Sequence, residues 1–66
     1  MFYTFKDGVT AINLEKVYYA KLNVDKEWGY FIEFYLRNGS LRDIFDNEEE
    51  CRQTFNDLFG NEKLSN

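Results

Sequence analysis

Alternation of apolar and polar residues along the first two thirds of the chain predicts β-strands. A period of two is typical of strands that bury one face. The pattern predicts four or five antiparallel strands, over residues 2–6, 9–13, 17–24, 28–37 and 40–45. Asp7-Gly8 and Asn38-Gly39 are expected to form tight hairpin turns. Residues 25–27 are expected to form a polar loop, and residues 14–16 a short reversal.

After residue 46 the pattern changes to a helical period. Four apolar residues fall at i, i+4, i+7 and i+8, which is one helix face: Cys51, Phe55, Leu58 and Phe59. Asp46 or Asn47 is the expected N-cap, and Gly60 is the expected end of the helix. The sequence therefore predicts an α+β fold. Its antiparallel β-meander of four to five strands is followed by one C-terminal helix packed on one sheet face. We expect a single domain over residues 1–60 and a disordered tail over 61–66.

The two turns also predict strand registers, and the registers divide the sheet into two faces. A two-residue loop at Asn38-Gly39 places Leu36 opposite Leu41, and the loop at 25–27 places Val24 opposite Trp28. Both registers give the same core face: Tyr18, Ala20, Leu22, Val24, Tyr30, Ile32, Phe34, Leu36, Leu41 and Phe45. Asp43 is the polar exception on this face and is expected at its rim. The placement of the first hairpin stays open.

One helix covers only one side of a sheet, so the opposite face is expected to be exposed. It carries an unusual number of apolar side chains, and such a surface typically marks an interface. The residues expected to bind a second copy or another partner are Val17, Tyr19, Phe31, Tyr35 and Ile44. The candidate contacts to a charged ligand or to nucleic acid are Lys21, Trp28, Arg37 and Arg42. The alternative is that these apolar residues are isolated among Lys and Arg stems, or covered by the first hairpin.

Composition narrows the function classes. The chain has 66 residues, of which 20% are aromatic, with 8 Lys+Arg, 12 Asp+Glu, no His and one Cys. A domain this small needs a dense aromatic core or self-association for stability. The net charge of −4 disfavours binding to a phosphate backbone. No transmembrane or signal segment is evident, so a cytoplasmic protein without a membrane partner is expected.

No motif for catalysis is evident, and we expect a non-enzymatic protein. Ser40 and Ser65 have no histidine to activate them, and Cys51 lies on the apolar helix stripe, where a structural role is expected. The acidic residues around the helix start do not have EF-hand spacing, and their simplest role is to favour the helix dipole. Glycine-rich phosphate loops are also absent from the sequence. Neither a cofactor nor a metal is expected.

The order of turns and elements resembles a broad class of small proteins. Asp7-Gly8, the segment AINLEKV at 11–17, Asn38-Gly39 and the acidic-capped helix give a layout similar to short bacterial and phage proteins. Small proteins of flagellar operons share this outline, and single-strand-binding coactivator folds resemble it in strand order. We expect a homo-oligomeric interaction protein, of the kind that phages or mobile elements use to inhibit or modulate a host macromolecule. The alternatives are a single-stranded nucleic-acid binder that uses the aromatic sheet face, and a binder of a small charged, nucleotide-like ligand at a subunit interface.

Overall fold

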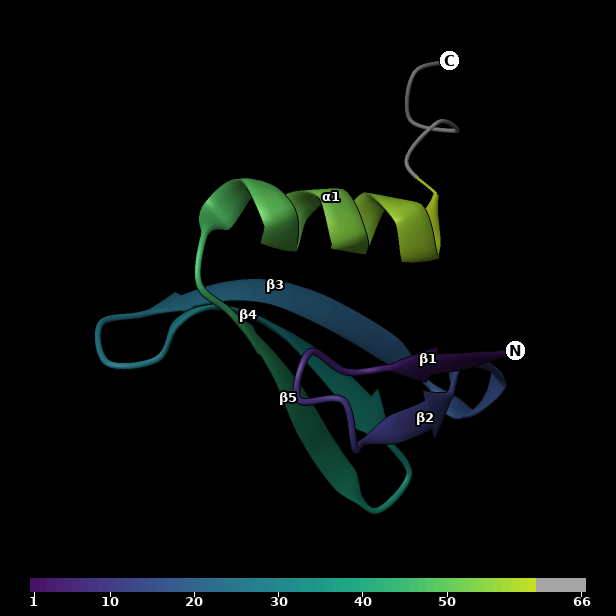
Figure 1. Ribbon diagram of the computed structural model, residues 1–66. Coiled ribbons are helices and arrows are strands. Elements are labelled where there is room, and N and C mark those ends of the chain that lie inside the picture. Colours follow the sequence, from purple (N-terminus) through teal and green to yellow (C-terminus); the bar gives the residue numbers. More distant parts are fainter. Residues whose placement is uncertain (61–66) are drawn as a thin grey trace.

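Two antiparallel sheets and a C-terminal helix form the fold in the computed structural model, which describes residues 1–60 (Figure 1). The elements are β1 (Phe2–Thr4), β2 (Ala11–Asn13), the 3-10 helix η1 (Leu14–Lys16), β3 (Tyr19–Asp25), β4 (Gly29–Leu36), β5 (Gly39–Phe45) and α1 (Glu48–Phe59). The α+β class and the helix packed on the sheet are confirmed. The single meander is wrong, because β1 and β2 pair only with each other, beside a sheet of order β3-β4-β5. The tail predicted over 61–66 lies outside the described residues.

The first hairpin keeps its predicted register but has a longer loop. Phe2 pairs with Asn13, as a two-residue turn at Asp7-Gly8 would require. The Asp7 carboxylate, however, accepts hydrogen bonds from the backbone N–H groups of Val9 (2.8 Å) and Thr10 (2.9 Å). These bonds lower the pKa of Asp7 and hold residues 6–9 in a wider loop.

In the larger sheet both registers differ by two residues from those predicted. Leu36 pairs with Gly39, so that Arg37 and Asn38 form the turn. Asp25 pairs with Gly29, because the Asp25 carboxylate binds the backbone N–H groups of the loop and places Trp28 in the turn rather than in β4. Gly39 and Gly29 both have positive φ, which favours glycine at these closing positions. Side chains alternate with a period of two, so this shift leaves each residue on its predicted face.

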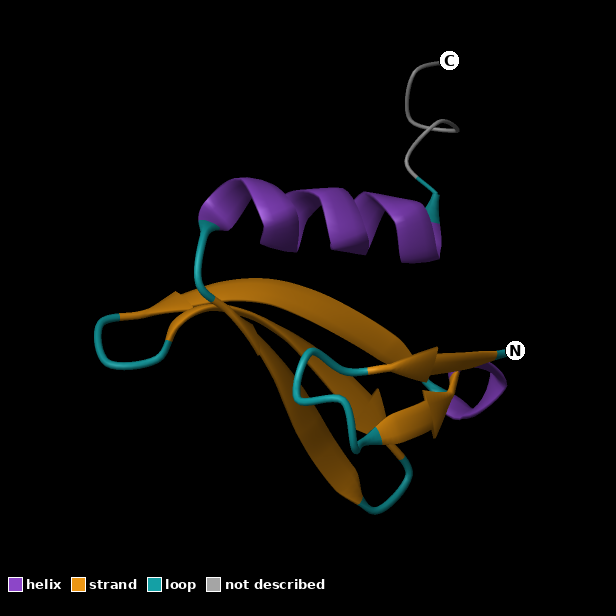
Figure 2. Cartoon of the chain, viewed as in Figure 1, coloured by secondary structure: helices purple, strands orange, loops and turns teal. Residues whose placement is uncertain are grey.

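The helix and the first hairpin cover the same side of the larger sheet. Phe34 is fully buried in their shared core, with the ring centres of Phe5 and Phe59 at 5.4 Å and 6.1 Å. The predicted helix face is confirmed, since Cys51 is fully buried and Phe55 and Leu58 pack against the core. In Figure 2 the helix lies along one side of the curved sheet. No helix within residues 1–60 is long and apolar enough to cross a membrane.

The larger sheet extends beyond the area that α1 and the first hairpin cover. Tyr18 and Val24 were predicted in the core, but they are 68% and 66% exposed. Leu41, also predicted in the core, is 40% exposed. These residues lie near the ends of the strands, where neither α1 nor the hairpin reaches them. The core is therefore concentrated around the middle of β4.

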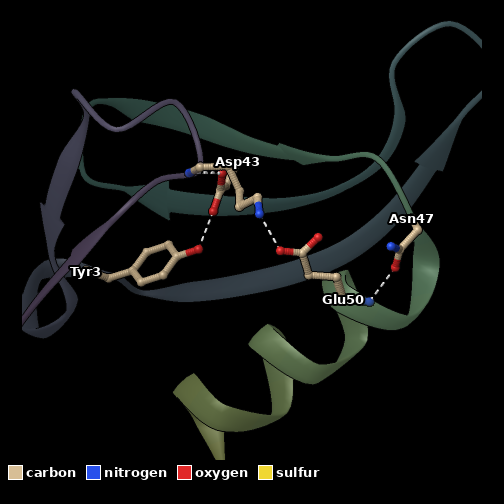
Figure 3. A network of polar contacts seen from close by, with 5 residues as sticks. Tyr3, Asp43, Asn47 and Glu50 are labelled. Atoms are coloured by element: carbon tan, nitrogen blue, oxygen red, sulfur yellow. Dashed lines mark hydrogen bonds and ion pairs between the residues drawn. The ribbon is translucent and has the colours of Figure 1, made fainter.

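Asp43 was predicted at the rim of the core face, but it is 1% exposed. Its carboxylate accepts a hydrogen bond from the Tyr3 hydroxyl and another from the backbone N–H of Lys6, at 2.9 Å (Figure 3). The Lys6 ammonium pairs in turn with Glu50, whose backbone N–H donates to the N-cap side chain of Asn47 at 2.7 Å. The network joins the hairpin, β5 and the start of α1. Asp43 is thus the polar anchor of the first hairpin.

Candidate functional site: the open face of the sheet

The side of the larger sheet opposite the core is the candidate site, and we call it the open face. Its residues alternate with the core residues along the three strands. They are Tyr19, Lys21, Asn23, Phe31, Glu33, Tyr35, Ser40, Arg42 and Ile44, with Trp28 beside them in the β3–β4 turn. Because α1 and the hairpin both pack on the core side, no described element covers this face.

A charged row crosses the middle of the open face. Lys21, Glu33 and Arg42 lie directly opposite one another on the three strands. The Glu33 carboxylate is almost buried, and it accepts hydrogen bonds from the Ser40 hydroxyl (2.6 Å) and the Tyr35 hydroxyl (3.1 Å). The Arg42 guanidinium lies 3.7 Å from the same carboxylate. The Ser40 hydrogen bond is the main reason that the pKa of Glu33 is lowered, so this side chain is held as a carboxylate.

On one side of this row, aromatic rings pack around Arg42. The guanidinium carbon lies 4.7 Å from the ring centre of Trp28 and 5.8 Å from that of Phe31. The Trp28 and Phe31 rings meet edge to face at 6.0 Å. This stacking leaves Phe31 only 7% exposed, while Trp28 and Ile44 are 44% and 45% exposed. The outer surface here therefore consists of Trp28, Ile44 and one rim of the guanidinium.

On the other side of the row, Tyr19 and Tyr35 stack. Their ring centres are 4.4 Å apart and the rings are nearly parallel, at 10°. Burial, and then the hydrogen bond to Glu33, raise the pKa of Tyr35. Tyr19 remains 53% exposed above it. The pair forms a rigid aromatic platform, since the Tyr35 hydroxyl is tied to the central carboxylate.

The structure brings most of the predicted site residues together, with two exceptions. Val17 follows η1 and packs against the core cluster instead of facing outwards. Arg37 lies in the β4–β5 turn and lines a groove at that end of the sheet. The predicted register, with Leu36 opposite Leu41, would also place Arg42 opposite Tyr35, whereas Arg42 faces Glu33 and stacks on Trp28. Arg37 and Arg42, both candidate contacts to a charged ligand, therefore have different surroundings.

Sequence reasoning missed Glu33 and Ser40, which organise the open face. The predicted registers placed Glu33 opposite Ile44, so the carboxylate had no cation beside it. A register two residues along each hairpin puts Glu33 between Lys21 and Arg42. Charge complementarity between opposite residues was the available signal, because opposite charges favour such cross-strand positions.

Two buried titratable side chains on the core side, Cys51 and Asp43, lie inside the packed core. Burial raises the pKa of the Cys51 thiol to about 11, so the thiol is protonated at neutral pH. The Asp43 carboxylate is almost fully buried and accepts hydrogen bonds from its two donors. Within residues 1–60, no three His, Cys, Asp or Glu side chains lie together as a metal site would require.

Comparisons of the chain with protein-family models, with curated proteins and with solved structures found no match.

Proposed function

We propose that the chain is a non-enzymatic interaction protein that associates with a second copy of itself through the open face. The observation that carries the proposal is the uncovered sheet face, on which Tyr19, Trp28 and Ile44 are each 44% exposed or more. Trp, Tyr and Arg are the residues that most often dominate binding energy at protein interfaces. Here the Glu33 carboxylate holds Tyr35 and Arg42, and Tyr19 and Trp28 stack on these two side chains. Less side-chain entropy therefore remains to be lost on binding.

Charge distribution supports the open face over the helix side as the surface where two copies meet. Residues 46–60 contain five carboxylates and one arginine. The open face has two cations and one nearly buried carboxylate. Two copies that meet through their helices would bring together the main excess of negative charge. Two copies that meet through their open faces keep these acids on the outside.

Light scattering over a wide concentration range tests the proposal. We expect a dimer or larger oligomer for the native chain. Ile44→Lys should shift the association to at least about tenfold higher concentration, because it places a third cation in the interface without touching the core. Circular dichroism and the melting curve of the dilute chain should remain close to those of the native protein, since surface substitutions usually change stability little.

Val24→Lys is the matched control. Val24 is also an exposed β-branched residue of the larger sheet, but its side chain lies on the core side. It should leave the association unchanged. A native chain that stays monomeric at all concentrations would refute self-association, and equal effects of the two variants would refute the assignment of the face.

Single-stranded nucleic acid is the second candidate, because the stacked Tyr19–Tyr35 pair lies beside the exposed Lys21. Bases stack on such platforms with little sequence preference. Fluorescence titration with an unstructured oligonucleotide at low salt tests this function. Binding should weaken in Tyr19→Ala and with added salt, whereas Val24→Lys should not reduce it. Failure to bind at low salt would exclude this candidate.

A further inference from the structure

A groove at one end of the larger sheet adjoins the open face at Ser40, but none of the exposed residues Tyr19, Trp28 and Ile44 belongs to its lining. It has a volume of about 550 Å³, within the range of small-molecule sites. It lies between η1 and the β4–β5 turn, and its lining includes Lys16, Tyr18, Leu36, Arg37 and Leu41. The apolar members belong to the end of the core side that α1 and the hairpin leave uncovered.

The lining of the groove combines apolar and cationic side chains. Leu36 and Leu41 are its aliphatic members, and Tyr18, which is largely exposed, is its aromatic member. Lys16 and Arg37 belong to the lining, from the two segments that flank the groove. Within the described part of the chain neither cation forms an ion pair. In this acidic protein, Lys16 and Arg37 thus remain without an ion pair beside the apolar residues of the lining.

The charge of the lining favours an anion as the ligand. Glu15 is the one acid of the lining, and its carboxylate lies 3.9 Å from the amino group of Met1. Lys16, Arg37 and Glu15 together leave an excess of one positive charge. A carboxylate carries one negative charge, whereas a phosphate monoester carries nearly two at neutral pH. The aliphatic side chains of Leu36 and Leu41 also favour an alkyl chain over a planar base, because a base stacks best on aromatic rings.

We propose that this groove binds a small aliphatic monocarboxylate, with its alkyl chain on Leu36 and Leu41 and its carboxylate between Lys16 and Arg37. Arginine suits this role because its planar guanidinium can bind both oxygens of a carboxylate. The proposal does not rest on self-association through the open face.

Amide chemical shifts of the ¹⁵N-labelled chain during titration with octanoate test the proposal. Octanol has the same chain length without the charge, and acetate has the charge without the chain. We expect octanoate to shift the signals of residues 15–18 and 36–41 and to bind at least about tenfold more tightly than either comparator. Arg37→Glu should weaken octanoate binding by a similar factor.

Lys26→Glu is the matched control, because Lys26 is an exposed cation in the β3–β4 turn and also lacks an ion pair. It should bind octanoate as the native chain does, and so should Ile44→Lys. Equal binding of octanol, retained binding in Arg37→Glu, or shifts spread over the open face would each overturn the proposal. So would a result in which only adenosine monophosphate, or only an acidic peptide, shifts these signals.

Discussion

Asp43 shows how one polar residue on an apolar face can determine the placement of a whole hairpin. Its carboxylate binds the Tyr3 hydroxyl and the Lys6 backbone N–H, both on the first hairpin. A buried carboxylate without donors would be strongly unfavourable, so the hairpin must bring these groups to it. The core face of the sheet thus stabilises the fold by burying apolar side chains. The hydrogen bonds of Asp43 on the same face also determine where the first hairpin packs.

Replacing Asp43 separates hydrogen bonding from charge. Asp43→Ala should lower the free energy of unfolding by about 1–3 kcal/mol, because it leaves two partly buried donors without acceptors. Asp43→Asn should remain within about 1 kcal/mol of the native chain or exceed it. The amide oxygen can accept from Lys6 while the amide nitrogen donates to Tyr3. Urea unfolding at neutral pH measures the free energy of unfolding of both variants. Equal losses of stability in the two variants would show that the charge of Asp43 itself is required.

The pH dependence of stability should differ in sign for the two nearly buried carboxylates. Burial raises the pKa of Asp43, so its contribution is complete below its unfolded pKa of about 3.9 and is lost as the pH rises through the folded value. The pKa of Glu33 is lowered, so its contribution is complete above its unfolded pKa of about 4.3 and is lost as the pH falls through the folded value.

Unfolding of the native chain, Asp43→Asn and Glu33→Gln across the acid range measures these contributions. The stability difference between the native chain and Asp43→Asn should fall with increasing pH. The difference between the native chain and Glu33→Gln should rise. Parallel curves for the two variants would contradict the opposite directions of the two pKa shifts.

At the scale of elements, the N-cap of α1 was among the features that local sequence could predict. The Asn47 side chain accepts from the backbone N–H of Glu50 at 2.7 Å. Asn47→Ala should therefore lower the free energy of unfolding by about 1 kcal/mol. Asn56→Ala, inside the same helix, is the control and should cost nothing, since alanine has the higher helix propensity. Circular dichroism during thermal unfolding compares the stabilities of the two variants. An equal loss of stability in both would exclude capping as the cause.

Alternation and capping predicted the elements, but they did not fix how strands align. Gly39 was expected inside the β4–β5 turn, whereas it closes the turn by pairing with Leu36. Asp25 was expected in the loop, whereas its carboxylate organises the loop from the end of β3. The loop after β3 depends on the hydrogen bonds of the Asp25 side chain, and the β4–β5 turn closes at a glycine with positive φ. An error of two residues preserved the two faces of the sheet, although Tyr18, Val24 and Leu41 on the predicted core face are exposed. The same error hid the row that contains Glu33, where pairing across strands matters.

At the scale of the whole molecule, the fold separates the acids of the helix from the exposed aromatic residues of the open face. The acids of residues 46–60 lie on the helix side of the sheet, while Tyr19, Trp28 and Arg42 lie on the open face. The first hairpin could have covered the open face, but Asp43 and the Phe34 cluster hold it on the core side. The exposure of the aromatic surface thus follows from the same contacts that complete the core.

This separation predicts how salt should act on the association. Two copies with a net charge of −4 repel at long range, and salt screens that repulsion, with a Debye length that falls from about 30 Å at 0.01 M to about 10 Å at 0.1 M. Contacts between apolar and aromatic surfaces do not depend on screening in this way. Association through the open face should therefore strengthen as salt is added, as measured by light scattering at fixed protein concentration. Binding of an oligonucleotide to the same face should weaken over the same range, because salt competes with phosphate contacts. If salt instead dissociates the oligomer, its contacts are mainly ion pairs, and the acidic helix of one copy against the cations of another becomes the interface to test.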